Sequence, residues 1–337
     1  MAADANQAIQ PAKPAASRKA NHENRLSSRI RGGYDSRSID RGFRMSQSTF
    51  VPLADHGLIR ASGEDAASFL HNLLTNDITH LPASGARHAA LCTAKGRMIA
   101  SFLIWREGPD YLLMLSADIL PGILKKLSMY VLRSKVKLAD ITAERTLVGV
   151  LGGDLLPAEP MTTAAWEGGT AIRLDAGRAI LVLPAGSSLP EGGRAGELAE
   201  WHLAEIRAGQ PRIVAATQEL FTPQMVNYEL PAVGGVSFQK GCYPGQEIVA
   251  RTQYLGKVKR RMYRVKLDRA FAPGTDVFTP EAGEQHCGNV VLCAPAPEGG
   301  FEALLVVQSS GMEADAVHVG SPDGLTAERL PLPYSVD

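Results

Sequence analysis

The pattern of apolar residues changes once along this chain, near Lys257, and this change limits the possible folds more than any other feature. Before it, strand-like runs alternate with segments of helical periodicity, such as the apolar face formed by Ala66, Phe69 and Leu70. After it, apolar and polar residues alternate over 261–267, and several short strands with Gly- and Pro-containing turns follow. A mixed region followed by an all-β end predicts an α+β protein with a small C-terminal β-barrel or sandwich.

Single elements follow from the same patterns. We expect a strand over 58–61 and then a helix, with Ser62 as its N-cap. Helices are also expected over 118–133 and 196–208, and Gly209 is a typical stop for the second of these.

Composition narrows the class of protein. A chain of 337 residues suggests two or three domains, and 45% apolar residues with zero net charge indicate a globular, soluble protein. No apolar run approaches the roughly 18 residues of a membrane span, so no membrane partner is expected. The cysteines show no Cys-x-x-Cys pair, which favours a reducing compartment and a cytoplasmic protein. The four are Cys92, Cys242, Cys287 and Cys293.

Residues 1–45 differ in composition from the rest. They contain nine Lys or Arg against four Asp or Glu and few large apolar residues. We interpret them as a disordered basic extension that is dispensable for folding, because they have little apolar surface to bury. A mitochondrial transit peptide, and hence a matrix location, is the alternative, but such peptides avoid acidic residues.

Residues 240–247 carry the most distinctive chemistry, with the sequence Lys-Gly-Cys-Tyr-Pro-Gly-Gln-Glu. Lys240 precedes Cys242 by two residues, and a nearby ammonium favours the reactive thiolate. Gly241 and Gly245 permit unusual backbone angles, and the Pro-Gly step is a turn signal. The pattern predicts a cysteine displayed on a tight loop.

Three roles for this cysteine remain open from the residues alone. Free cysteines are often buried, but its neighbours are not apolar. A redox-sensitive or cluster-contacting thiol fits the lysine and the turn. A covalent nucleophile needs a paired base, and no histidine is near it in the sequence. Cys92 is most simply a core residue. His286, Cys287 and Cys293 lack the fourth ligand of a closed zinc site, so we predict no metal site.

The eight residues match the signature Lys-Gly-Cys-Tyr-x-Gly-Gln-Glu of the YgfZ family at every specified position, and the chain resembles that family from about residue 50 onward. Residues 221–224 and 234–238 also resemble it. These folate-binding relatives of the glycine-cleavage T-protein act in iron–sulfur cluster maintenance and tRNA modification. The resemblance implies two interlocked α/β subdomains over 46–256 and a C-terminal β-barrel over 257–337.

The resemblance also implies a site. Cys242, aided by Lys240, would be the functional thiol, and the ligand would be tetrahydrofolate or another reduced folate. The residues that the resemblance suggests for cofactor binding are Gly241, Tyr243, Gly245, Gln246, Glu247, Arg251 and Asn227. Gln246 and Glu247 have the alternative role of holding the loop backbone. Arg251 and the basic run after it are either a solvated face or contacts for a polyglutamate tail or RNA phosphates.

Two departures from the aminomethyltransferase branch predict that this chain lacks that activity. The run 95–101 contains no carboxylate, with Ala100 and Ser101 near its end, and neither side chain replaces an acid at neutral pH. Arg207 stands where the Arg-x-Glu-Ala-Gly pattern of the superfamily has its pterin-binding Glu. We therefore expect a monomeric accessory protein whose partners are iron–sulfur assembly proteins or client enzymes. A transferase with a rewired catalytic group is the alternative. Direct RNA binding is disfavoured by the zero net charge.

Overall fold

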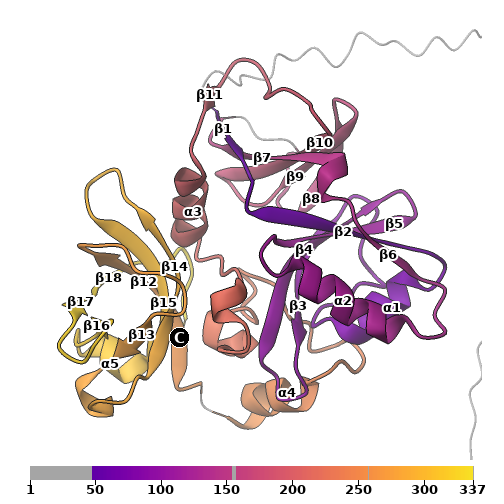
Figure 1. Cartoon of the computed structure of the whole chain (residues 1–337). Helices are drawn as coiled ribbons and strands as arrows, with labels where there is room; N and C mark the ends of the chain where they lie inside the picture. Colours follow the sequence, from indigo (N-terminus) through magenta and orange to yellow (C-terminus); the bar gives the residue numbers. More distant parts are fainter. Residues whose placement is uncertain (1–47, 154–156, 257, 337) are drawn as a thin grey trace, which may run out of the picture. The chain divides into compact units, whose positions relative to one another are not determined.

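The computed structural model describes residues 48–153, 157–256 and 258–336, and the expected extension over 1–45 lies outside them. The described part contains three sheets and five α-helices (Figure 1). It begins in one sheet with β1 (Thr49–Pro52), enters the next with β2 (His56–Ser62), and returns to the first with β7 (Arg145–Leu151). This exchange of strands links the first two sheets.

The five-stranded sheet has the order β3-β4-β5-β2-β6. Its strands besides β2 are β3 (Ala86–Cys92), β4 (Met98–Glu107), β5 (Asp110–Ser116) and β6 (Lys137–Asp140). Helices α1 (Ala66–Leu73) and α2 (Leu120–Val131) cover one face (Figure 1).

Period-two alternation explains how this sheet is buried on both faces. In β4, Phe102 and Ile104 pack in the cluster that contains the buried residues of α1 and α2. Leu103 and Trp105, on the opposite face, pack against residues of the six-stranded sheet. The sheet is therefore the middle layer between the helices and the second sheet.

The six-stranded sheet has the order β11-β1-β7-β10-β9-β8. Its further strands are β8 (Thr162–Trp166), β9 (Gly169–Arg173), β10 (Arg178–Pro184) and β11 (Arg194–Ala195). Helix α3 (Leu198–Arg207) follows and begins with a capping box in which Glu197 and Glu200 each accept from the other's backbone N–H. Gly209, at a φ of 64°, ends it as expected.

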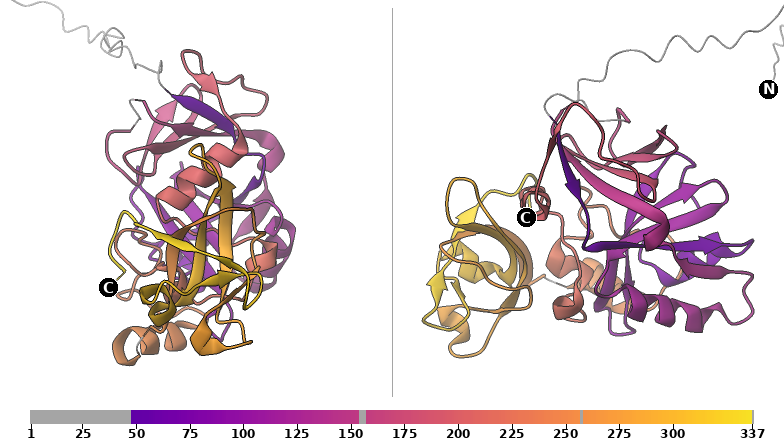
Figure 2. Two further views of the ribbon diagram at one scale, coloured as in Figure 1. Left: turned by 90° about the vertical axis from the view of Figure 1, so that its left-hand side faces the viewer. Right: turned by 45° about the horizontal axis from the view of Figure 1, so that its top comes forward.

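The C-terminal sheet has seven strands in the order β17-β16-β13-β14-β15-β12-β18. They are β12 (Arg260–Leu267), β13 (Asp276–Phe278), β14 (Gly288–Pro295), β15 (Phe301–Gln308), β16 (His318–Val319), β17 (Leu325–Thr326) and β18 (Glu328–Leu330). The strands curl into a nearly closed barrel around their own core, with α5 (Ser309–Glu313) at one end (Figure 2). The predicted α+β class with a C-terminal barrel is confirmed.

One local prediction was wrong. Ser62 is not an N-cap, because it still pairs with Lys137 at the end of β2, and Asp65 precedes the helix instead. Helix α4 (Gln246–Leu255), which begins directly after Gly245, was not predicted. Short 3-10 turns complete the described chain at Thr142–Glu144, Ala215–Thr217, Pro223–Val226 and Pro280–Ala282.

Candidate functional site

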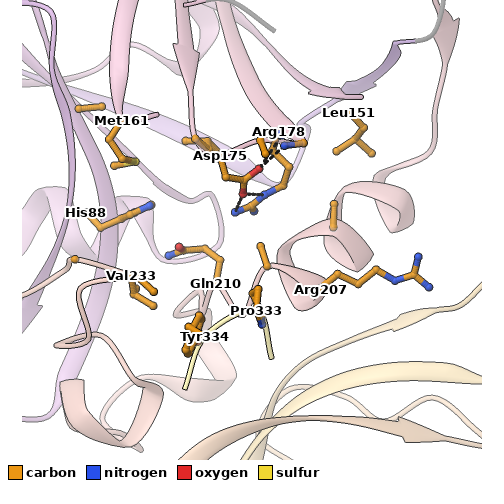
Figure 3. Close-up of a pocket in the computed structure, with 18 of the residues that line it drawn as sticks. His88, Leu151, Met161, Asp175, Arg178, Arg207, Gln210, Val233, Pro333 and Tyr334 are labelled. Atoms are coloured by element: carbon orange, nitrogen blue, oxygen red, sulfur yellow. Dashed lines mark hydrogen bonds and ion pairs between the residues drawn. The ribbon is translucent and has the colours of Figure 1, made fainter. Parts of the chain in front are cut away.

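A cavity of about 960 Å³ opens where β3, the turn between β9 and β10, α3 and the segment 231–234 meet (Figure 3). Leu151, Met161, Val233 and Pro333 give it apolar walls. Its size is at the upper end of the range for pockets that enclose small-molecule ligands, which are mostly apolar with a few placed polar groups.

Both carboxylates among the described residues that line this cavity are already engaged. Asp175 accepts hydrogen bonds from the backbone N–H of Gly177 at 2.8 Å and of Arg178 at 2.9 Å, and from Arg178 Nε at 2.8 Å. Glu200 forms an ion pair with Arg194 and accepts from the Glu197 backbone N–H. The described wall therefore offers hydrogen-bond donors to a ligand more readily than it offers free carboxylates.

Arg178 is the central cation of this wall. It is 6% exposed, and its Cζ lies 5.9 Å from the ring centroid of Trp201. Its Nη1 is buried with no hydrogen-bond partner among the described residues, while the other guanidinium nitrogens face Asp175. The residue lines the large cavity and also a smaller one of about 50 Å³. An unpaired buried donor is costly, so an acceptor that reached Nη1 would be bound favourably.

His88 and Gln210 also point into the cavity (Figure 3). Burial, with the charge of Arg178 as a smaller cause, lowers the pKa of His88 to about 4. The imidazole is therefore neutral at pH 7 and has one ring nitrogen that donates and one that accepts.

Arg207 lies at the edge of the cavity but extends away from it towards the barrel (Figure 3). Its Nε and Nη2 donate to Glu302 at 3.0 and 2.7 Å, and Nη2 also donates to Glu298 at 2.9 Å. Arg207 thus fastens α3 to the barrel.

Cys242 lies on the surface, in the turn before α4. It is the exposed member of the four described free cysteines, whereas Cys92 and Cys287 are buried and Cys293 is half-buried. Gly245 holds the end of the turn at a φ of 82°, with its Cα packed so closely on the β3–β4 turn that an added Cβ would lie 2.4 Å from the Thr93 carbonyl oxygen. The sequence correctly predicted an exposed thiol on a glycine-flanked turn.

Lys240 anchors the same turn. Its Nζ donates to the carbonyl oxygens of His71 and Leu74, the second at 2.6 Å, at the C-terminal end of α1. It also lies 4.9 Å from the ring centroid of Tyr243. Burial lowers the pKa of Lys240 to about 8, against the opposing charges of Asp77 and Cys242. The ammonium therefore fixes the turn to α1 as well as placing a positive charge near the thiol.

The residues expected to bind the cofactor do not line the large cavity. Asn227 is fully buried, and its amide donates to the Met262 carbonyl oxygen at 2.8 Å, which joins the 3-10 turn before it to β12. Glu247 and Arg251 are exposed on α4, and Gln246 is half-buried. Tyr243 is buried, while Gly241 and Gly245 belong to the turn itself. Their predicted contact with a cofactor stays a prediction.

The cavity and the Cys242 turn share one wall, the segment 74–77. Asn76 faces the cavity and donates to the carbonyl oxygens of His88 and Gly234, both at 2.7 Å. The next residue, Asp77, instead contacts His71 on the side of Cys242. The sequence analysis missed this segment, and it missed Asp175, Arg178 and His88, since no motif marks them.

In 48–153, 157–256 and 258–336, no three His, Cys, Asp or Glu side chains gather as they would to hold a metal ion. No helix in these ranges is long and apolar enough to cross a membrane.

Comparison with known proteins finds relatives across most of the chain. It is 30% identical over 320 aligned residues to the tRNA-modifying protein YgfZ of Escherichia coli, covering 86% of this chain and 94% of that protein. The tRNA-modifying protein YgfZ of Photobacterium profundum is likewise 30% identical, over 313 residues, covering 87% and 94%. A scan against models of protein families finds no match.

The fold has a solved counterpart. The glycine cleavage system aminomethyltransferase T from Bartonella henselae superposes with a TM-score of 0.66, covering 87% of this chain and 88% of that one. At 15% sequence identity this likeness concerns the fold. The predicted three-lobed, T-protein-like architecture is confirmed.

Proposed function

This chain belongs to the YgfZ family, and from that membership we propose that it is a folate-dependent accessory protein in iron–sulfur cluster assembly or repair, with Cys242 as its functional thiol. Its contribution to tRNA modification, the activity that the names of its relatives describe, would be indirect, through the cluster enzymes that it supports.

The cavity around Arg178 supports a folate ligand. Its volume and apolar walls suit a flat ring system, and the buried Nη1 lacks an acceptor among the described residues. The carbonyl group of a pterin or the carboxylates of a folate tail supply such acceptors. A reduced folate carries one-carbon units when bound. Arg178 and the neutral His88 would bind and orient it, and Leu151 and Met161 would exclude water from its ring.

The accessory role is supported above all by one observation: both carboxylates among the described residues that line the cavity already hold hydrogen bonds or ion pairs within the protein. Proton transfer to a bound folate needs a group with a free lone pair or proton at the reacting atom. Asp175 is held by three donors, and Glu200 by Arg194. At the β4 positions near the missing acids, Ala100 is fully buried and Ser101 Oγ accepts from the Ile213 backbone N–H at 2.9 Å. These contacts support binding without aminomethyl transfer.

The exposed thiol supports a role in handling clusters. Cysteine thiolates are the ligands that iron–sulfur clusters use, and a surface cysteine can reach a cluster carried by another protein. The cluster is cargo in this proposal, and the partners are assembly proteins or client enzymes. We propose that the protein acts as a monomer in the cytoplasm.

Titration with tetrahydrofolate, followed by tryptophan fluorescence, tests the proposal. Trp201 lies beside Arg178, so a ligand at this wall should change its emission with a saturable dependence on concentration. Absence of saturable binding up to about 1 mM would contradict folate binding. Aminomethyl transfer from a lipoyl carrier to tetrahydrofolate should be undetectable, and a measurable rate would support a rewired transferase instead.

A further inference from the structure

The C-terminal end of α2 exposes large apolar side chains beside a groove. Met129, Tyr130 and Leu132 are exposed there, and Leu132 most of all, at 87%. The surface groove has a volume of about 720 Å³ and is lined by Asp65, Tyr130, Leu132, Arg133 and Ser134. Single exposed apolar residues are ordinary, but several that gather at one place mark an interaction site.

The backbone of Leu132 has a conformation that favours glycine. Its φ is 44° and its ψ is −103° at the end of the helix. A Cβ causes steric repulsion at positive φ, which glycine avoids. Neither the backbone geometry nor the exposure favours leucine for stability, so contact with another molecule accounts best for this side chain.

The same segment is strongly basic. Residues 119–139 contain five Lys or Arg and no Asp or Glu. Lys125 lies one helical turn before Met129, and both are exposed, so basic and apolar side chains share a face of α2. Lys135 pairs with Glu64 at 2.7 Å, whereas the other four cations form no ion pair among the described residues. The charge of this surface is therefore largely uncompensated.

We propose that the groove and these basic residues, together called the α2 surface, form a docking site for a protein whose contact surface carries carboxylates around aliphatic side chains. The carboxylates would pair with the free cations, and an aliphatic side chain would enter the groove against Tyr130 and Leu132. That this partner is an assembly protein or a client enzyme rests on the proposed function.

Other occupants of the α2 surface fit less well. In a two-fold contact with a second copy of this chain, the same basic patch would face itself. RNA would match the charge but not the leucine and methionine, because its bases stack on aromatic rings and guanidinium planes. An anionic lipid surface would also match the charge, but a soft, flat surface makes no use of a groove with a fixed leucine at its rim.

Helix α1 connects the α2 surface to the turn that carries Cys242. Asp65, just before α1, lines the groove and accepts a hydrogen bond from the Lys135 backbone N–H at 2.7 Å. At the other end of α1, Lys240 of the turn donates to the Leu74 carbonyl oxygen at 2.6 Å. Since α1 has eight residues, it is about 12 Å long. An ordinary interface of about 800 Å² per partner is on the order of 30 Å across, so it would extend from the groove as far as the turn.

Binding of a designed peptide to the full-length protein tests the docking site. The probe is a dye-labelled helical peptide with leucines on one face and glutamates on the other, and fluorescence anisotropy gives its Kd. We expect saturable binding that weakens about tenfold between about 50 and 500 mM NaCl, because salt screens exposed charges. A peptide with lysines in place of the glutamates should not bind.

Matched variants on α2 and α4 locate the contact. Leu132→Gly should weaken peptide binding about tenfold through the lost apolar contact and keep Tm within about 2 °C, since relief of the backbone offsets the flexibility of glycine. Leu255→Gly is its control, because Leu255 is 85% exposed at the end of α4, and its Kd should stay within about twofold of wild type. Arg133→Glu should also weaken binding about tenfold, whereas the exposed Arg251→Glu should not.

Several results would overturn the proposal. One is a peptide that does not bind, and another is an equal loss of binding in the α2 and α4 variants. Vesicles that contain phosphatidylserine and a single-stranded RNA are the competing probes. If either of these bound in place of the peptide, and Leu132→Gly abolished that binding, the α2 surface would be assigned to lipid or RNA instead of a protein.

The outcome is separable from the proposed function, because the assay contains no folate and does not require the thiol. A failed peptide test with saturable tetrahydrofolate binding rejects the docking site alone. Peptide binding that Leu132→Gly weakens, in a protein that does not bind folate, rejects the proposed cofactor and leaves the docking site standing.

Discussion

The cavity around Arg178 and the turn around Cys242 are built in opposite ways. In the cavity, Asp175 and Arg178 pair with each other, and Arg178 Nη1 is buried with no hydrogen-bond partner among the described residues. In the turn, the thiol is exposed, and the groups that hold it bind backbone carbonyls of α1. The first arrangement suits the ligand proposed for it, and the second leaves the thiol open to solvent.

The segment 74–77 is the wall between the two regions, with Asn76 on one side and Asp77 on the other. Since neighbouring residues face opposite ways, each region can be altered while the other is left intact. Ligand binding and thiol reactivity should thus respond to different substitutions, and the following changes test that independence.

The largest effect is expected from Cys242→Ser. Loss of the sulfur should abolish support of cluster enzymes in a deletion strain, because an alcohol neither binds iron like a thiolate nor reacts like one. Tm and folate affinity should stay at the wild-type values. Cys293→Ser, in the barrel, is the control and should complement. Full complementation by Cys242→Ser would show that the thiol is structural.

Gly245→Ala should destabilise the fold by about 3 kcal/mol in urea unfolding. The positive φ costs about 1–2 kcal/mol, and the added Cβ would meet the Thr93 carbonyl oxygen at 2.4 Å. Gly234→Ala is the matched control, since its φ is also positive, at 66°, but the nearest atom is 3.6 Å away. It should cost about 1 kcal/mol. Equal costs would mean that the close approach of the turn to β3–β4 is unimportant.

Arg178→Gln should weaken tetrahydrofolate binding ten- to a hundredfold, the effect of losing a hydrogen bond from a charged donor, about 1.5–3 kcal/mol. Asp175 keeps its two backbone donors in this variant, so the β9–β10 turn should survive. Fluorescence titration gives the Kd. Alkylation of Cys242 should be unchanged, and an unaltered Kd would place the ligand elsewhere.

The smallest effect concerns pH and His88. Its pKa is about 4 in the folded protein and about 6.5 when unfolded, so below pH 6.5 only the unfolded chain takes up the proton. Stability should therefore fall by about 2 kcal/mol between pH 7 and 5 through this group. His88→Gln should remove that part of the decline in urea unfolding, whereas the exposed control His286→Gln should keep it. Identical declines in all three proteins would exclude His88 as the cause.

Sequence patterns predicted the layout well where periodicity was strong. The apolar face of Ala66, Phe69 and Leu70 is buried in α1, and alternation after Lys257 correctly indicated the barrel. Helix α4 was missed because it packs weakly, with Ile248 and Leu255 among its exposed residues. A short helix that buries little carries little periodic signal.

The sequence by itself determined the family, the mixed fold with its barrel, and an exposed cysteine on a glycine-flanked turn, because each of these depends on residues that are close in the chain. Only the tertiary structure decided that Arg178 and His88 share a cavity and that His71 stands beside the turn of Cys242. His71 and Cys242 are 171 positions apart in the sequence. Strand exchange between sheets and the packing of α1 bring these two segments together, and no local sequence pattern predicts that.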